Sequence, residues 1–142
     1  MKIYFAASIR GGRQDVELYV ELIKYLSKYG EVLTEHIGDK NIEETGEKHM
    51  TDVEIHNRDM EWLMSSDIIV AEVTTPSLGV GYEIARAFEA EKRVICLYRV
   101  EGEKRLSAML TGNKGLETYN YKRIEEAKRI IDKVLKLQHD RT

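Results

Sequence analysis

The sequence predicts an α/β fold in which one doubly wound sheet of about five parallel strands carries helices on both faces. Short apolar runs alternate with amphipathic helical patterns, and this alternation is typical of parallel strands joined by crossover helices. The chain has 142 residues, the size of one domain, and its only proline, Pro76, does not mark a linker. We therefore expect one domain over residues 1–137, followed by a frayed tail of residues 138–142.

The expected strands are short runs rich in apolar residues, bounded by polar or turn-forming residues. Parallel strands are covered by helices on both faces, so a continuous apolar run fits such a strand better than strict alternation does. In chain order the predicted strands are Lys2–Ala7, Glu31–Glu35, Asp67–Val73, Arg93–Tyr98 and Glu117–Tyr121.

The expected helices carry apolar residues at the three- and four-residue spacing that places them on one face. The first helix shows this spacing at Val16, Tyr19, Val20, Ile23 and Leu26. Gly30 is placed to end it. The segment Ile37–His49 is polar and contains two glycines, so we expect a surface loop there. The remaining helices are expected at Asp52–Ser65, Val80–Glu91, Arg105–Leu110 and Lys122–Leu137.

Composition and charge exclude several classes of function. The chain has 22 Lys and Arg against 25 Asp and Glu, a net charge of −3, which disfavours tight binding to a nucleic-acid backbone. Its single cysteine, Cys96, cannot form an internal disulfide, and its first apolar run is too short for a signal peptide or a membrane span. The four histidines fall at no metal-ligand spacing. We expect a cytoplasmic protein without a metal, a cofactor, a nucleic-acid partner or a membrane partner.

The first loop after a strand offers groups suited to an anion, and ligands of doubly wound sheets bind at the carboxyl ends of the strands. Ser8, Arg10 and Arg13 stand with Gly11 and Gly12 just before a helix, so side-chain and backbone donors lie beside the positive helix end. A phosphate or nucleotide cradle and a solvated turn both fit this spacing. The first turn lacks G-x-G-x-x-G, and G-x-x-x-x-G-K-[ST] occurs nowhere, which disfavours dinucleotide and P-loop chemistry.

Glu83 is an acidic residue within an apolar helical stripe. The stripe contains Val80, Ile84 and Ala87, and Glu83 lies three residues after the first and four before the last. Such a position is uncommon for a glutamate unless it is paired or functional, although a helix dipole also favours an acid in the first turn. We favour the functional interpretation.

Asp59 has a similar placement between Ile55 and Trp62 on another helix. A functional carboxylate and an acid at the edge of the stripe paired with Arg58 or a lysine are equally compatible with this position. Two carboxylates that meet at one cleft suit glycosidic-bond cleavage, because one can attack or stabilise the anomeric carbon while the other assists. Tyr4 lies in the first strand near the same end of the sheet, where core packing is the default for an aromatic residue.

Four separated segments of the chain resemble one family, the 2′-deoxynucleoside 5′-phosphate N-hydrolases of the nucleoside 2-deoxyribosyltransferase superfamily. The resemblance extends from the first strand to beyond Met109. The matching segments are Tyr4–Arg13 (YFAASIRGGR), Val32–His36 (VLTEH), Ala71–Glu83 (AEVTTPSLGVGYE) and Leu106–Met109 (LSAM).

This resemblance implies a Rossmann-like domain that acts as a homodimer and hydrolyses the N-glycosidic bond of deoxynucleoside monophosphates. It implies that Glu83 is the nucleophile of a covalent intermediate, that Asp59 is the assisting carboxylate and that Tyr4 holds the nucleophile. Ser107 would reach the phosphate from the neighbouring subunit. The implied substrate-binding residues are Ala7, which stands where the family has glycine, together with Ser8, Ile9, Arg10, Arg13, Ser77, Gly79, Ser107 and Met109.

Ser77 predicts the form of the substrate. In relatives that use nucleosides, the family pattern places an aspartate six residues before the nucleophile, where this chain has Ser77. A serine hydroxyl can donate to a phosphate, whereas an aspartate there would set like charges together.

The sequence leaves three alternative functions open, which are a deoxyribosyltransferase, a ribonucleotide hydrolase and a nucleotide-binding module without catalysis. The P-G-G-x-G-T-x-x-E motif of cytokinin-activating phosphoribohydrolases is absent, which disfavours one kind of ribonucleotide hydrolase.

Overall fold

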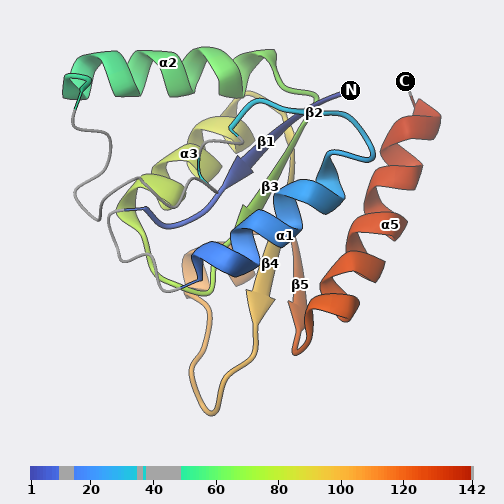
Figure 1. Ribbon diagram of the computed structural model, residues 1–142. Helices are drawn as coiled ribbons and strands as arrows, with labels where there is room; N and C mark the ends of the chain where they lie inside the picture. Colours follow the sequence, from blue (N-terminus) through green and yellow to red (C-terminus); the bar gives the residue numbers. More distant parts are fainter. Residues whose placement is uncertain (10–14, 35–36, 38–48, 142) are drawn as a thin grey trace.

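Five parallel strands form one sheet in the order β2-β1-β3-β4-β5 in the computed structural model, which describes residues 1–9, 15–34, 37 and 49–141 (Figure 1). The chain starts in β1 and winds outward first to one edge and then to the other, so the predicted doubly wound arrangement is confirmed. The strands are β1 Lys2–Ala6, β2 Glu31–Val32, β3 Ile68–Glu72, β4 Arg93–Arg99 and β5 Glu117–Tyr121.

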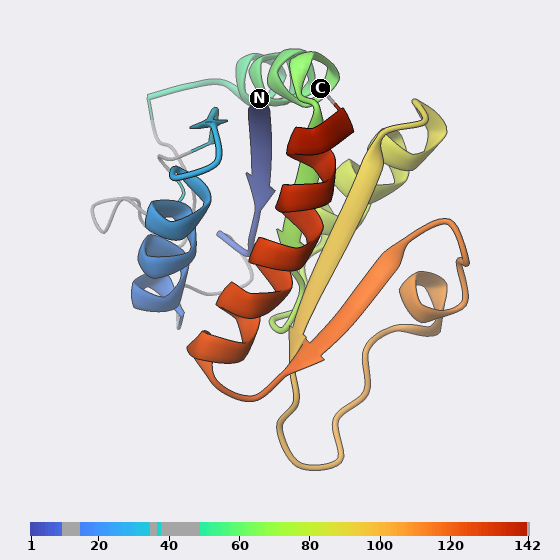
Figure 2. The same cartoon turned by 90° about the vertical axis from the view of Figure 1, so that its right-hand side faces the viewer.

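Helices cover both faces of this sheet. Helices α1 and α5 pack on one face, and α2 and α3 pack on the other (Figures 1 and 2). The short helix α4 lies between β4 and β5 in the chain. The helices are α1 Val16–Leu26, α2 Asp52–Ser65, α3 Leu78–Glu89, α4 Ala108–Thr111 and α5 Ile124–Arg141.

The alternation of side chains along β1 divides the core between these two faces. Ile3 and Phe5 pack with α1 and α5, whereas Tyr4 and Ala6 pack with α2 and α3. All four are buried. Tyr4 therefore lies on the same side of the sheet as the helix that carries Glu83.

Gly30 does not end α1 as predicted. The helix ends at Leu26, and the backbone N–H of the C-cap residue Ser27 donates to the Ile23 carbonyl at 2.9 Å. A Cβ atom on Gly30 would lie 2.2 Å from the carbonyl oxygen of Met1, so this position needs glycine because the chain passes close to the start of β1.

Strand β2 is shorter than the predicted Glu31–Glu35. The buried Thr34 turns its hydroxyl to the neighbouring strand, accepts a hydrogen bond from the Phe5 backbone N–H at 2.8 Å and donates to the Phe5 carbonyl at 2.6 Å. The Leu33 backbone N–H still donates to the Ile3 carbonyl at 3.0 Å, and from Thr34 on a side chain replaces the backbone contact to β1.

Capping residues set the helix starts. Thr51 and Glu54 form a capping box at the start of α2, whose bounds are those predicted. Ser77 caps α3, so this helix begins at Leu78 rather than at the first inward-facing residue, Val80. The last helix starts at Ile124 and extends to Arg141, beyond the predicted end at Leu137, and α4 starts at Ala108 rather than at Arg105.

Candidate active site

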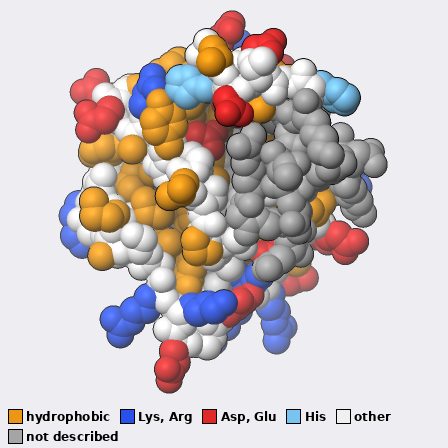
Figure 3. Space-filling view, turned by 90° about the vertical axis from the view of Figure 1, so that its left-hand side faces the viewer, with side chains coloured by type: hydrophobic (Ala, Val, Ile, Leu, Met, Phe, Trp, Pro, Cys, Tyr) orange, Lys and Arg blue, Asp and Glu red, His pale blue; other side chains and the backbone are white. Residues whose placement is uncertain are grey.

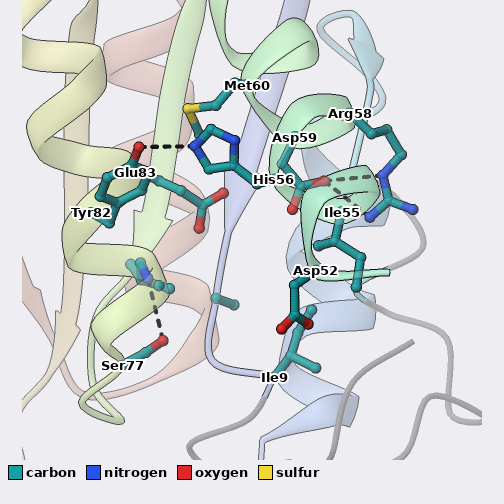
Figure 4. A pocket seen from close by; sticks show the side chains of 13 residues that line it. Ile9, Asp52, Ile55, His56, Arg58, Asp59, Met60, Ser77, Tyr82 and Glu83 are labelled. Carbon is teal, nitrogen blue, oxygen red and sulfur yellow. Dashed lines mark hydrogen bonds and ion pairs between the residues drawn. The ribbon is translucent and has the colours of Figure 1, made fainter. Parts of the chain in front are cut away.

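A pocket of about 310 Å³ opens between α2 and α3 beside the carboxyl end of β1 (Figure 4). Figure 4 shows the Glu83 carboxylate pointing from α3 toward α2, with Asp59 facing it from α2. The two carboxylates that the sequence analysis singled out on separate helices therefore share one pocket. Its lining residues are Ala7, Ile9, Asp52, Ile55, His56, Arg58, Asp59, Met60, Ser77, Gly79, Val80, Tyr82 and Glu83.

Glu83 is held by a tyrosine from the sheet. The buried Tyr4 hydroxyl donates a hydrogen bond to Glu83 Oε2 across 79 positions of sequence. Burial raises the pKa of Tyr4, and the neighbouring Glu83 and Asp59 raise it further, so Tyr4 keeps its proton and acts as a donor. The donor fixes one oxygen of Glu83 and leaves the other able to face the pocket.

The environment of Glu83 tunes its protonation. Burial raises the pKa of Glu83 from 4.5 to about 7, the Tyr4 hydrogen bond opposes this shift, and the nearby Asp59 adds to it. A carboxyl group that is partly desolvated and titrates near neutral pH is typical of a functional site. Its ionised form is a better nucleophile than an ordinary, fully solvated carboxylate.

Asp59 is both paired with Arg58 and part of the pocket. Arg58 Nε and Nη2 lie 3.1 and 3.0 Å from Asp59 Oδ1, and the side chains of the pair are 23% and 24% exposed. Arg58 also lies over the Trp62 ring, with its guanidinium carbon 4.7 Å from the ring centroid. Asp59 therefore makes the ion pair with Arg58 that the sequence allowed and also lines the pocket that contains Glu83, so the pairing does not exclude a functional role.

Ser77 and Gly79 lie at the positive end of α3 and line the same pocket. The Ser77 hydroxyl accepts a hydrogen bond from the Val80 backbone N–H at 3.3 Å, so its own proton remains available for an anion. The helix dipole and the first backbone N–H groups of α3 favour negative charge at this position. This end of the pocket is suited to a phosphate.

The first loop is described only in part. Ala7 and Ile9 line the pocket, while Ser8 is fully buried and its hydroxyl has no hydrogen-bond partner within the described segments of the chain. A buried hydroxyl without a partner is uncommon in native proteins. Arg10 and Arg13 lie outside the described residues.

Ser107 and Met109 do not line this pocket. Both are exposed at the start of α4, where Ser107 is the N-cap residue and its hydroxyl accepts a hydrogen bond from the Met109 backbone N–H at 3.2 Å. Met109 is 82% exposed. Within one subunit these two residues lie outside the pocket that contains Glu83, Asp59 and Ser77.

The sequence analysis missed several lining residues on α2 and α3. His56 Nε2 lies 2.9 Å from the Tyr82 hydroxyl, and Arg86 Nη1 donates to the same hydroxyl at 2.6 Å, so these side chains connect the two helices at the pocket. The spacing of Asp52, His56 and Asp59 on one helix face was a signal that could have indicated the lining role of α2.

Among the described residues, no group of three or more His, Cys, Asp or Glu side chains is arranged to hold a metal ion. In that part of the chain, no helix combines the length and the apolar character that crossing a membrane requires.

Comparison with known proteins identifies the class to which this fold and pocket belong. The sequence model of the nucleoside 2-deoxyribosyltransferase family matches residues 3–131. A 5-hydroxymethyl-dUMP N-hydrolase of Esox lucius is 54% identical over 114 residues, which cover 79% of this chain and 79% of the relative. A protein of the same name from Danio rerio is 54% identical over 112 residues, covering 79% and 78%. The chain belongs to the nucleoside 2-deoxyribosyltransferase family, as its sequence resemblance indicated, and it is an enzyme of the glycosidase class.

A solved structure supports the fold independently. The structure of the Clostridium botulinum CMP N-glycosidase BcmB superimposes with a TM-score of 0.66 and covers 93% of this chain and 99% of its own. The two sequences are 19% identical, so this likeness concerns the fold alone.

Proposed function

We propose that the protein hydrolyses the N-glycosidic bond of 2′-deoxynucleoside 5′-monophosphates through a covalent intermediate on Glu83. The observation that carries this proposal is the Glu83 carboxylate, held by the Tyr4 hydroxyl in a pocket that also contains Asp59 and the positive end of α3. These groups match the three needs of the reaction, which are a nucleophile, a second carboxylate and a phosphate site.

In the first step, an oxygen of ionised Glu83 bonds to C1′ of the deoxyribose while the bond from C1′ to the base nitrogen breaks. The base leaves with the electron pair of that bond and takes a proton from solvent. Asp59, oriented by Arg58, stabilises the positive charge that develops on the sugar ring. Tyr4 keeps the attacking carboxylate in place.

In the second step, water attacks C1′ and the ester bond to Glu83 breaks, with its electron pair returning to the carboxylate. The proton lost by water passes to Asp59 and then to solvent, which restores the proton used in the first step. The products are the free base and 2-deoxyribose 5-phosphate.

The substrate assay follows from the names of the relatives. We expect base release from 5-hydroxymethyl-dUMP and from at least one ordinary deoxynucleoside monophosphate, measured by chromatography of the products. A second free base added to the reaction separates hydrolysis from transfer, because a transferase would form a new nucleotide. Release of no base from any deoxy- or ribonucleoside monophosphate would refute this proposal.

The pH dependence of turnover should report Glu83. Because this carboxyl titrates at about 7 and attacks only when ionised, kcat/KM should fall tenfold for each pH unit below that value and level off above it. Asp59→Asn should move the inflection to lower pH, since the Asp59 charge raises the pKa of Glu83. Tyr4→Phe should move it to higher pH, since the Tyr4 hydrogen bond lowers that pKa.

The substrate phosphate also titrates, with a pKa of about 6, but it is the same for all three proteins. A difference in inflection pH between the three proteins therefore reports the pKa of Glu83 rather than that of the substrate. Identical inflections in wild type, Asp59→Asn and Tyr4→Phe would mean that Glu83 is not the titrating group.

We also propose that the active form is a homodimer in which Ser107 of one subunit reaches the phosphate bound by the other. Leu78, at the start of α3, is 97% exposed and Met109 on α4 is 82% exposed. On the face of the molecule that Figure 3 presents, hydrophobic side chains gather on the side away from the residues drawn in grey. Exposed apolar side chains next to a polar site are typical of an interface between subunits.

Complementation between subunits tests this dimer. Glu83→Ala and Ser107→Asp should each be nearly inactive alone, because one lacks the nucleophile and the other places a negative charge at the phosphate. Unfolding and refolding the two variants together should restore about a quarter of wild-type activity, since half of the randomly paired dimers then carry one intact site. No recovery, or a monomeric active enzyme in sedimentation, would contradict the shared site.

A further inference from the structure

A second buried carboxylate lies on the opposite face of the sheet from the pocket. Glu72 ends β3, is 0% exposed and points to the side of the sheet that α1 and α5 cover, where it meets the buried Tyr121 of β5. None of the residues that contact its carboxylate lines the pocket. The reaction proposed above does not use it, and burying an acidic group is costly unless it is well paired.

Three donors surround this carboxylate. The Thr74 backbone N–H donates to Glu72 Oε1 at 2.7 Å, the Thr74 hydroxyl donates to Oε2 at 3.0 Å, and the Tyr121 hydroxyl also donates to Oε2. Burial raises the pKa of Glu72, while these hydrogen bonds oppose the shift. A carboxylate accepts from all three donors at once, whereas a glutamine would turn an amide N–H toward at least one of them.

The network continues from Thr74 to β4 and α1. The Arg99 backbone N–H at the end of β4 donates to the Thr74 hydroxyl at 2.9 Å. The Arg99 guanidinium lies 3.1 Å from Asp15 Oδ2, and Asp15 is the N-cap residue of α1. The Asp15 side chain makes no capping hydrogen bond to its own helix, so its carboxylate serves this contact instead.

The network therefore joins the carboxyl ends of β3, β4 and β5 to the start of α1. Figure 1 shows these ends at the same edge of the sheet. The segment that begins at Thr74 leads to Ser77 and Gly79 at the start of α3, and Asp15 directly precedes α1. The loops before both helices are those on which the sequence analysis placed the phosphate-binding residues.

We propose that Glu72 is a positioning residue for the phosphate end of the active site. It acts from the opposite face of the sheet, through the hydrogen-bonded series of Thr74, Arg99 and Asp15. This inference rests on the proposed function, because it concerns how the same site binds a monophosphate. Glu72 fixes where the segment from Thr74 to Ser77 leaves the sheet, and thereby sets the position of the Ser77 hydroxyl and the α3 N–H groups. Loss of this contact should weaken phosphate binding and leave the Glu83–Tyr4 pair intact.

Glu72→Gln tests the inference with little change of shape. We expect KM for 5-hydroxymethyl-dUMP, or for whichever monophosphate the wild type hydrolyses, to rise about tenfold while kcat stays within about threefold. The inhibition constant of inorganic phosphate should rise in parallel with KM. Thr74→Val should behave in the same way, and Thr74→Ser, which keeps the hydroxyl, should restore wild-type values. If Glu72→Gln fails to fold, this Thr74 pair decides the question.

Asp132→Asn is the matched control. Asp132 on α5 also accepts hydrogen bonds from tyrosines, Tyr25 at 2.7 Å and Tyr29, but it is not among the pocket-lining residues. This variant should lower the melting temperature without changing KM or phosphate inhibition. Unchanged KM and phosphate inhibition in both Glu72→Gln and Thr74→Val, with an active wild type, would overturn the inference. An inactive wild type would instead refute the proposed function.

Discussion

Replacing Glu83 by alanine should lower kcat at least about a thousandfold, because the reaction loses the atom that bonds to C1′. The affinity for 2-deoxyribose 5-phosphate, measured by calorimetry, should change only a few-fold, because the proposed phosphate-binding groups, Ser77 and the backbone N–H groups at the start of α3, are unchanged. Glu83→Gln keeps the shape of the side chain and can still accept from Tyr4, so it separates loss of the nucleophile from loss of packing. Near-normal turnover in either variant would refute the assignment of Glu83 as nucleophile.

The same Glu83→Gln variant should be more stable than the wild type at neutral and alkaline pH. The pKa of Glu83 is about 7 in the folded protein against an ordinary 4.5, so the folded state binds the proton more tightly than the unfolded state does. Wild-type stability is therefore lost as pH rises from about 4.5 to about 7. A neutral glutamine avoids this loss, and thermal unfolding at pH 8 should show a melting temperature higher by a few degrees.

Replacing Ser77 by aspartate should lower kcat/KM for a deoxynucleoside monophosphate by about two to three orders of magnitude. Like charges brought together in a desolvated site cost several kcal/mol. Turnover of the corresponding nucleoside, which has no phosphate, should not fall, so the ratio of the two specificity constants measures the effect.

Ser77→Asn is the control for this change. Both asparagine and aspartate are good N-cap residues, so α3 should keep its start in both variants and the melting temperature should stay near that of the wild type. The asparagine variant should retain monophosphate turnover within about tenfold, because it lacks the charge. Equal losses in the two variants would show that the size of the side chain, rather than its charge, decides the selectivity.

The spacing of apolar residues and the turn-forming residues between the apolar runs were sufficient to predict the parallel sheet and most of its helices. The bounds of α1 lie where the apolar spacing begins and ends, and those of α2 coincide with the predicted ones. Errors arose where a contact between distant segments set the local structure. Thr34 ends β2 by bonding to Phe5, and Gly30 is required by the approach of Met1, and neither contact has a local sequence signal.

The placement of Glu83 and Asp59 among apolar residues at helical spacing singled out two carboxylates that the structure brings into one pocket. Spacing within each helix does not reveal which residues of α2 and α3 face each other, so His56 and Tyr82 were missed. The sequence analysis did not predict a role for Glu72, for a similar reason. It lies in an apolar strand, and its partner Tyr121 comes from a strand 49 positions away, so only the fold shows why an acid is stable there.

The central claim, a covalent sugar intermediate on Glu83, is tested most directly by the stereochemistry of a methanol-trapped product. In water containing methanol, part of the intermediate should be captured as methyl 2-deoxyriboside 5-phosphate, whose anomeric configuration is stable and can be read by NMR. Two successive inversions at C1′ predict the β-anomer, the configuration of the substrate. The α-anomer would show a single direct displacement by the solvent nucleophile and would contradict the account.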